Sequence, residues 1–161
     1  PLSKGTLLKQ RKPTRLKQWD YASPHVYHVT ICTKHKQNLL SNIRTNGFRT
    51  DIELTSIGKQ LDTVIAAVAD ENPDIEFVDY VIMPNHVHLL VRSKNSNKNI
   101  ANIIGMIKSR TTKLARTDEP SIDLGQRGFY DHIIRGEKDY LDTIEYIQNN
   151  PAKWAEDEYF N

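Results

Sequence analysis

The chain has 161 residues, of which 26% are charged and 38% are hydrophobic, and its formal net charge at pH 7 is +2. This length fits one domain with its own hydrophobic core, and this composition excludes a disordered chain. Because no apolar run could cross a bilayer and no signal-peptide pattern opens the chain, we expect a cytoplasmic protein with no membrane partner. The single cysteine, Cys32, lies in an apolar run, which predicts a buried thiol.

Basic residues gather in two places although the net charge is small. Residues 1–20 are basic, are interrupted by Pro13 and contain no acid before Asp20, so we expect an irregular N-terminal arm. A single domain is then expected over residues 21–161. The second basic group consists of Lys108, Arg110, Lys113 and Arg116. Such groups can neutralise the phosphates of a nucleic acid, or they can form an ordinary solvated surface.

The first half of the chain predicts two strand regions around one helix. Residues 25–33 are rich in β-branched and aromatic residues and predict a strand. Residues 34–54 predict a polar connection with a turn at Asn46-Gly47 and a short extended piece over residues 48–54. From Ser56 the apolar residues recur every three or four positions, which predicts an amphipathic helix that Asn72-Pro73 ends. Residues 75–82 predict the next strand.

The second half predicts a strand, a helix, a short strand and a terminal helix. Residues 83–85 form a tight connection, and residues 86–92 predict an antiparallel partner for residues 75–82. A helix follows from residue 100, with Ile100, Ile103, Ile104, Ile107 and Leu114 on one face. Residues 129–134 predict a strand and residues 137–149 the last helix. The first six elements follow the split β-α-β repeat of an α+β ferredoxin-like sandwich, whose antiparallel sheet carries helices on one face.

Two groups of polar residues are candidates for a site on the other face of this sheet. His86 and His88 alternate along a strand, so both side chains project from one face, about 7 Å apart, and could hold a divalent metal ion. In the terminal helix Tyr140, Ile144 and Ile147 form the apolar stripe, whereas Tyr146 and Asn150 lie off it and one turn apart. Each feature alone also has an ordinary structural explanation, as a core histidine, a surface tyrosine or a helix stop.

Taken together, these features resemble the single-tyrosine HUH transposases, in the branch of the REP-associated tyrosine transposases and their insertion-sequence relatives. The resemblance extends over residues 24–154. The segments that carry it are residues 83–90 (MPNHVHLL), 125–135 (GQRGFYDHIIR) and 146–151 (YIQNNP).

The resemblance implies a role for each matching residue. His86 and His88 match the metal-ligand histidines, Tyr146 matches the nucleophile, and Asn150 matches a polar residue that adds a third ligand. It further implies a Mg²⁺- or Mn²⁺-dependent enzyme that cuts single-stranded or hairpin DNA through a 5′-phosphotyrosine and acts as a homodimer. Independently of the resemblance, the basic residues Lys108, Arg110, Lys113 and Arg127 are candidate phosphate contacts.

A second hypothesis of a different class stays open at this point. A ferredoxin-like sheet with basic flanks can bind single-stranded nucleic acid without cutting it. A pure binding module, however, has no reason to combine His86 and His88 with Tyr146 and Asn150. The sequence also leaves open whether the terminal helix acts in its own subunit or in a partner.

Overall fold

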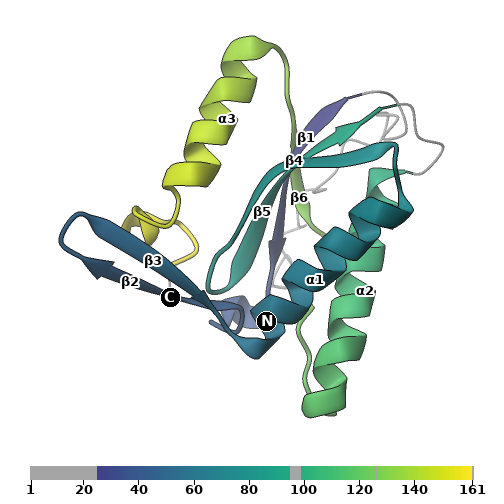
Figure 1. The fold of residues 1–161 in the computed structure, drawn as a ribbon, viewed down its shortest axis with the longest axis vertical. Coiled ribbons are helices and arrows are strands. Elements are labelled where there is room, and N and C mark those ends of the chain that lie inside the picture. Colours follow the sequence, from purple (N-terminus) through teal and green to yellow (C-terminus); the bar gives the residue numbers. More distant parts are fainter. Residues whose placement is uncertain (1–24, 95–98, 126, 161) are drawn as a thin grey trace, which may run out of the picture.

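The structure, a computed structural model, describes residues 25–94, 99–125 and 127–160. The basic arm therefore lies outside the described residues. Figure 1 shows the elements, which follow in chain order: β1 (Val26–Cys32), the 3-10 turn η1 (Lys34–Lys36), β2 (Ser41–Asn46), β3 (Arg49–Leu54), α1 (Ser56–Glu71), β4 (Ile75–Ile82), β5 (His86–Ser93), α2 (Ile100–Asp118), β6 (Tyr130–Ile133), α3 (Glu137–Asn149) and the 3-10 turn η2 (Trp154–Glu156).

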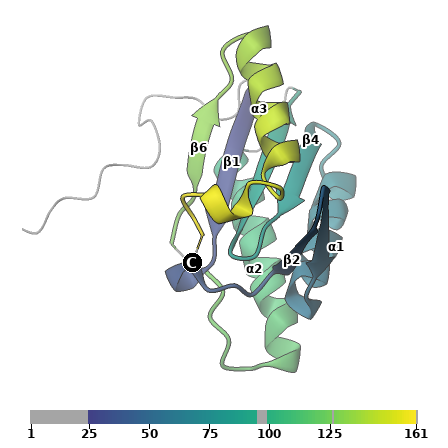
Figure 2. The ribbon, with the colours of Figure 1, turned by 90° about the vertical axis from the view of Figure 1, so that its left-hand side faces the viewer.

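The main sheet has the strand order β4-β5-β1-β6, and every neighbouring pair is antiparallel. With β2 and β3 set aside, this is the order of a ferredoxin-like sandwich, so the predicted α+β fold is confirmed. Helices α1 and α2 cover one face of the sheet, and α3 with the C-terminal residues covers the other (Figure 2). No helix in the described part of the chain is both long and apolar enough to cross a membrane.

The hydrophobic core lies between the sheet and α1 and α2. On β5 the alternate residues Val87, Leu89 and Val91 are buried in it. They pack with the isoleucines of α2 that sequence periodicity placed on one face, Ile100, Ile103, Ile104 and Ile107. Because strand residues alternate between faces, burying the odd-numbered residues of β5 directs His86 and His88 to the α3 side.

One member of the predicted α2 stripe is not in the core. Leu114 is 39% exposed, whereas Ala115 is buried in a second apolar cluster with Ile122 and Leu124. The end of α2 extends beyond the sheet (Figure 1). There the helix packs against the residues that follow it in the chain instead of against the sheet. The stripe prediction was therefore wrong for Leu114, because the packing partner of the helix changes along its length.

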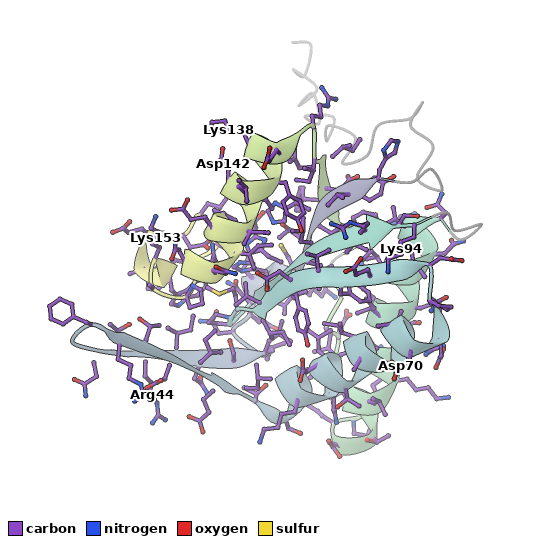
Figure 3. The ribbon with its side chains drawn as sticks, turned by 45° about the horizontal axis from the view of Figure 1, so that its top comes forward. Arg44, Asp70, Lys94, Lys138, Asp142 and Lys153 are labelled. Atoms are coloured by element: carbon purple, nitrogen blue, oxygen red, sulfur yellow. The ribbon has the colours of Figure 1, made fainter. Side chains whose placement is uncertain are left out.

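Strands β2 and β3 form a separate two-stranded hairpin where sequence predicted a polar connection with one extended piece. They pair from Ser41 opposite Leu54 to Asn46 opposite Arg49. Gly47 adopts a φ of +63° in the turn, as the Asn46-Gly47 signal leads one to expect. The hairpin projects from the main body, with Arg44 on its outer part (Figure 3). Because its residues are mostly exposed, it lacks the hydrophobic alternation that would have revealed β2.

Candidate active site

His86 and His88 lie side by side on β5 beneath α3 and are almost completely buried, with 0% and 1% of each residue exposed. Their Nε2 atoms are 3.0 Å apart and their ring centroids 4.6 Å apart. The outer nitrogen of each ring also has a partner. His86 Nδ1 is 2.8 Å from Asn85 Oδ1, and His88 Nδ1 is 3.0 Å from Thr30 Oγ1 and 3.1 Å from His28 Nε2.

Both imidazoles are neutral at neutral pH. Burial lowers the pKa of His86 to about 4, although the carboxylate of Asp157 opposes this shift. Burial also lowers the pKa of His88 to about 2, and the neighbouring His86 and His28 add to the effect. A neutral imidazole has a free lone pair on one nitrogen, which is the form that binds a metal ion.

Helix α3 brings Tyr146 to this pair within the same chain. The Tyr146 ring lies 5.1 Å from the His88 ring and 5.7 Å from the His28 ring, centroid to centroid. The side chain remains 42% exposed, so a large substrate has access to it. Burial raises the pKa of the Tyr146 phenol, and the carboxylate of Asp157 adds to this, while the Asn150 amide acts in the opposite direction. The phenol is therefore protonated at neutral pH.

The buried face of α3 differs from the predicted stripe. Thr143, Ile147 and Asn150 are buried, whereas Leu141 is 55% exposed. Helix α3 packs on β4 and β5, on the sheet face that carries the histidines, so polar side chains can point inward. Lys138 and Asp142 form an ion pair on the solvent side of the helix (Figure 3). Asn150, predicted to lie off the packed face, thus lies toward the sheet, together with Thr143.

Asp157 is a site residue that sequence reasoning missed. The chain after α3 folds back through η2, and the Asp157 side chain, only 2% exposed, places Oδ2 3.9 Å from His86 Nε2. Tyr159 follows and stacks its ring 4.5 Å from that of His86. Asp157 is flanked by two exposed acids, Glu156 and Glu158, so nothing local distinguishes it from a solvated acidic tail.

The donors at this position suit a divalent cation. His86, His88 and Asp157 offer ligand atoms that all lie within 4.8 Å of one another. Two buried oxygens, Asn150 Oδ1 and Asp157 Oδ2, have no partner of full hydrogen-bond geometry among the described residues, although Asn150 lies close enough to His86 to raise its pKa. Leaving such a group unsatisfied costs about 1–3 kcal/mol, more when it is charged, and a bound cation would remove that cost. The predicted ligands His86, His88 and Asn150 thus lie together, with Asp157 as an addition.

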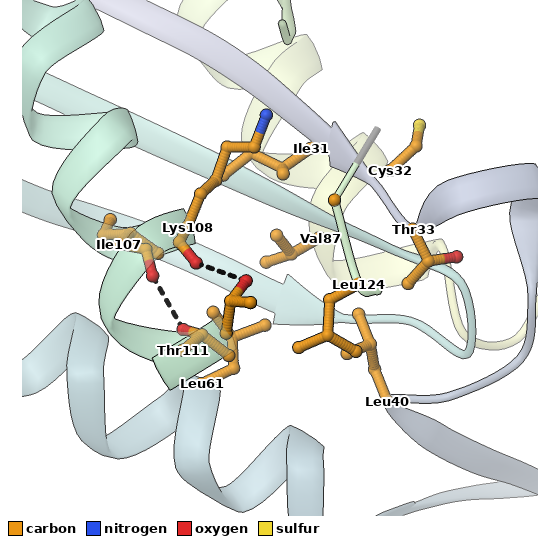
Figure 4. A pocket seen from close by; sticks show the side chains of 12 residues that line it. Ile31, Cys32, Thr33, Leu40, Leu61, Val87, Ile107, Lys108, Thr111 and Leu124 are labelled. Carbon is orange, nitrogen blue, oxygen red and sulfur yellow. Dashed lines mark hydrogen bonds between the residues drawn. The ribbon is translucent and has the colours of Figure 1, made fainter. Parts of the chain in front are cut away.

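Three of the four predicted DNA contacts lie on α2, and the fourth, Arg127, lies in the loop before β6. Lys108, Arg110 and Lys113 belong to α2, on the sheet face opposite Tyr146. Lys108 Nζ donates to the Gly128 carbonyl at 2.9 Å, and its stem lines an apolar hollow of about 50 Å³ (Figure 4). Arg110 is held by two bonds to Glu71, of 3.0 and 2.8 Å.

Arg127 is exposed and precedes Gly128, whose carbonyl oxygen accepts from Lys108. It lines a hollow of about 420 Å³ together with the cationic turn η1, Cys32, Tyr130 and Tyr159. Because Tyr159 also stacks on His86, this hollow adjoins the histidine pair.

Several known proteins resemble this chain in sequence. The family model described as "Transposase IS200 like" matches residues 21–150. An uncharacterized protein of Haemophilus influenzae is 30% identical over 174 residues, covering 95% of this chain and 94% of that protein. Another H. influenzae protein, named "Putative REP-associated tyrosine transposase", is 30% identical over 93 residues, covering 52% of this chain and 53% of its own length.

A solved structure shares the fold of this chain. A REP-associated tyrosine transposase bound to a REP hairpin superposes with a TM-score of 0.67 at 21% identity, covering 87% of this chain and 73% of that chain. The family model, which matches more than half of the chain, is decisive. The chain belongs to the family of IS200-like transposases.

Proposed function

We propose that this transposase is a metal-dependent single-stranded DNA endonuclease and strand transferase in which Tyr146 is the nucleophile. The observation that carries the proposal is the 5.1 Å approach of the Tyr146 ring to His88, a member of a buried, neutral histidine pair. Tyr146 is also partly exposed, as a residue that attacks a polymer must be. The alternative hypothesis is a module that only binds nucleic acid. Such a module does not require a cation site, whereas the buried oxygens beside the two imidazoles favour one.

The proposed reaction is a reversible exchange of phosphoester bonds. Tyr146 Oη attacks the phosphorus and forms a P–O bond, the bond from phosphorus to the 3′ oxygen breaks, and the phenolic proton is lost as the 3′ oxygen gains one. The products are a 5′-phosphotyrosine and a free 3′-OH. A 3′-OH, the same or another, can then attack the phosphotyrosine, so rejoining needs no external energy source.

His86, His88, Asn150 and Asp157 would hold the divalent cation. Two nitrogen and two oxygen donors suit Mn²⁺, and Mg²⁺ is compatible when the DNA phosphate supplies further oxygens. When bound, the cation polarises the scissile phosphate and neutralises charge that builds up during attack. The phenol needs such assistance because its pKa is raised and it is therefore a weak nucleophile at neutral pH.

Hairpin or single-stranded DNA is the proposed substrate, as for the relative whose structure contains a REP hairpin. Of the nominated DNA contacts, Arg127 is best placed, since it lines a hollow with η1, the exposed Tyr130 and Tyr159, and Tyr159 contacts His86. Arg110 and Lys113 would contact DNA only if it also passed over α2, whereas the Lys108 ammonium is bonded to Gly128, next to Arg127. A homodimer and a cytoplasmic, DNA-associated location remain part of the proposal.

The test is incubation with single-stranded DNA hairpins and Mn²⁺ or Mg²⁺, followed by denaturing gel analysis for a covalent protein–DNA adduct. The natural chain should form the adduct, and Tyr146→Phe should not. Tyr140→Phe is a matched control, because Tyr140 lies on the same helix but interacts with Arg92 rather than with the histidines. An adduct that persists in Tyr146→Phe would refute the role of this tyrosine as the nucleophile.

A further inference from the structure

Asn85, in the turn between β4 and β5, is completely buried and uses its whole amide group. Its Nδ2 donates to the carbonyl oxygen of Lys36 at 3.2 Å and to that of Tyr159 at 2.7 Å. Its Oδ1 lies 2.8 Å from His86 Nδ1. One side chain thus connects the η1 turn, the C-terminal residues and the first histidine of the pair.

These contacts determine which way the amide faces. Only the nitrogen of an amide can donate, and a carbonyl oxygen can only accept. Exchanging Oδ1 and Nδ2 would place Oδ1 against two carbonyl oxygens and lose both bonds. Since Oδ1 must therefore face His86 and can only accept, the proton of the neutral His86 ring has to be on Nδ1.

We propose that Asn85 is a positioning residue that holds His86 in its Nδ1–H tautomer and so directs the Nε2 lone pair at the cation site. The tautomer follows from the hydrogen bonds of a neutral ring, whereas its value for cation binding rests on the proposed function. Partners on the outer nitrogen of a ligating histidine orient the ring and raise its basicity. Asn85 also anchors the carbonyl of Tyr159, two residues from Asp157. The same amide therefore helps to place a second proposed ligand.

His88 is held differently, and its proton can change position. With a lone pair on His86 Nε2, the 3.0 Å contact between the two Nε2 atoms requires the proton of His88 to lie on its own Nε2 when no cation is bound. His88 Nδ1 then accepts from Thr30 Oγ1 or His28 Nε2. A hydroxyl can also accept, so when a cation occupies the site the proton of His88 can move to Nδ1 and be donated to Thr30. One histidine is thus fixed and the other switches.

The direct test is long-range ¹H–¹⁵N correlation spectroscopy of the histidine rings in the cation-free, full-length chain at neutral pH, which identifies the protonated nitrogen. We expect the proton on Nδ1 in His86 and on Nε2 in His88. A proton on Nε2 of His86 would overturn the proposal. Because this measurement uses the unmodified chain, it does not depend on whether any variant folds.

Three variants separate positioning from folding. Asn85→Leu removes the acceptor, so His86 should become a mixture of tautomers and Mn²⁺ affinity, measured by calorimetry, should fall roughly ten- to hundredfold. Asn85→Asp keeps an acceptor toward His86 and should keep the Nδ1–H tautomer, although it loses the two bonds that Nδ2 donates to the carbonyls of Lys36 and Tyr159. Thr33→Val is the structural control, because Thr33 Oγ1 shares its proton between the backbone carbonyls of Gln37 and Asn85 and so supports the backbone of this region rather than a histidine ring. It should leave the tautomer unchanged.

The outcomes distinguish this inference from the proposed function. If Asn85→Leu leaves the His86 tautomer unchanged, the role of Asn85 is refuted, whatever happens to activity. If His86 has the expected tautomer but the natural chain does not bind Mn²⁺, the cation site is refuted while the tautomer assignment stands.

Discussion

Asp157 shows at the level of one residue how a buried charge can indicate a ligand. Its Oδ2 is buried near His86 without a hydrogen-bond partner in the described part of the chain, while Oδ1 accepts from the Tyr159 amide at 2.7 Å. A carboxylate in that position is destabilising unless a cation compensates it. The prediction is that Asp157→Asn lowers Mn²⁺ affinity by at least about tenfold, measured by calorimetry, while the cation-free variant is no less stable than the natural chain.

The matched control is Glu158→Gln, which removes the neighbouring but exposed acid. Its Mn²⁺ affinity should stay within about twofold of the natural chain, because an exposed charge is screened by water and salt. Equal losses in the two variants would mean that general negative charge, and not ligation by Asp157, attracts the ion.

The buried histidines also predict how stability depends on pH. Burial lowers the pKa of His28 and of His86 to about 4 and that of His88 to about 2, below the value of about 6.5 in an unfolded chain. As the pH falls below 6.5, the unfolded chain therefore takes up protons that the folded chain does not. The cation-free chain should lose stability from pH 6.5 toward pH 4, by up to about 1.4 kcal/mol per pH unit for each group.

Urea unfolding at pH 7, 6, 5 and 4.5 measures this slope. In His28→Gln the free energy of unfolding should depend less steeply on pH than in the natural chain, because one buried imidazole has been removed. Saturating Mn²⁺ should steepen the loss, since protons then compete with the ion for both ligand histidines. A free energy of unfolding that is constant from pH 7 to pH 4.5 would contradict the assignment of these rings as buried and neutral.

At the level of the elements, the start of α1 is set by a close backbone contact. Thr55 caps the helix by accepting from the Gly58 amide, and a Cβ at Gly58 would lie 1.9 Å from the Leu40 carbonyl oxygen. Gly58→Ala should therefore destabilise the fold by about 1–3 kcal/mol in urea unfolding, although alanine favours helices. At Gly105 in α2 a Cβ would meet nothing within 4 Å, so Gly105→Ala should stabilise by up to about 1 kcal/mol. If both variants change the free energy of unfolding in the same direction, this difference in packing is contradicted.

Because α2 lies on the sheet face opposite Tyr146, we expect its arginine Arg110 to contribute less to DNA binding than Arg127 does. Arg127 lines the hollow beside the histidine pair, whereas Arg110 is already paired with Glu71 on the opposite layer. Arg127→Ala should therefore weaken binding of a single-stranded DNA hairpin more than Arg110→Ala, in fluorescence anisotropy at one fixed salt concentration. The reverse order would place the DNA over α2.

For the whole molecule, the decisive feature is that one chain supplies both halves of the site. Tyr146 from α3 meets His88 from β5 without a second copy. We therefore predict that mixing Tyr146→Phe with His88→Ala, each unable to form the DNA adduct, restores no adduct, whether or not the protein is a dimer. Recovery of adduct in the mixture would mean that α3 exchanges between subunits. As a control, the natural chain should form the adduct equally well with and without His88→Ala, which would show that the variant does not inhibit adduct formation.

Short-range patterns in the sequence were enough to predict the α+β fold, the position of His86 and His88 on one strand face, and the placement of Tyr146 and Asn150 one turn apart. Strand alternation and helical periodicity are local properties, so they can be read without knowing what packs where. Only the tertiary structure brings Tyr146 to His88, turns Asn150 and Thr143 toward the sheet and buries Asp157 beside His86. These depend on how α3 and the following residues dock on the sheet, and docking is decided by long-range packing that no local pattern contains.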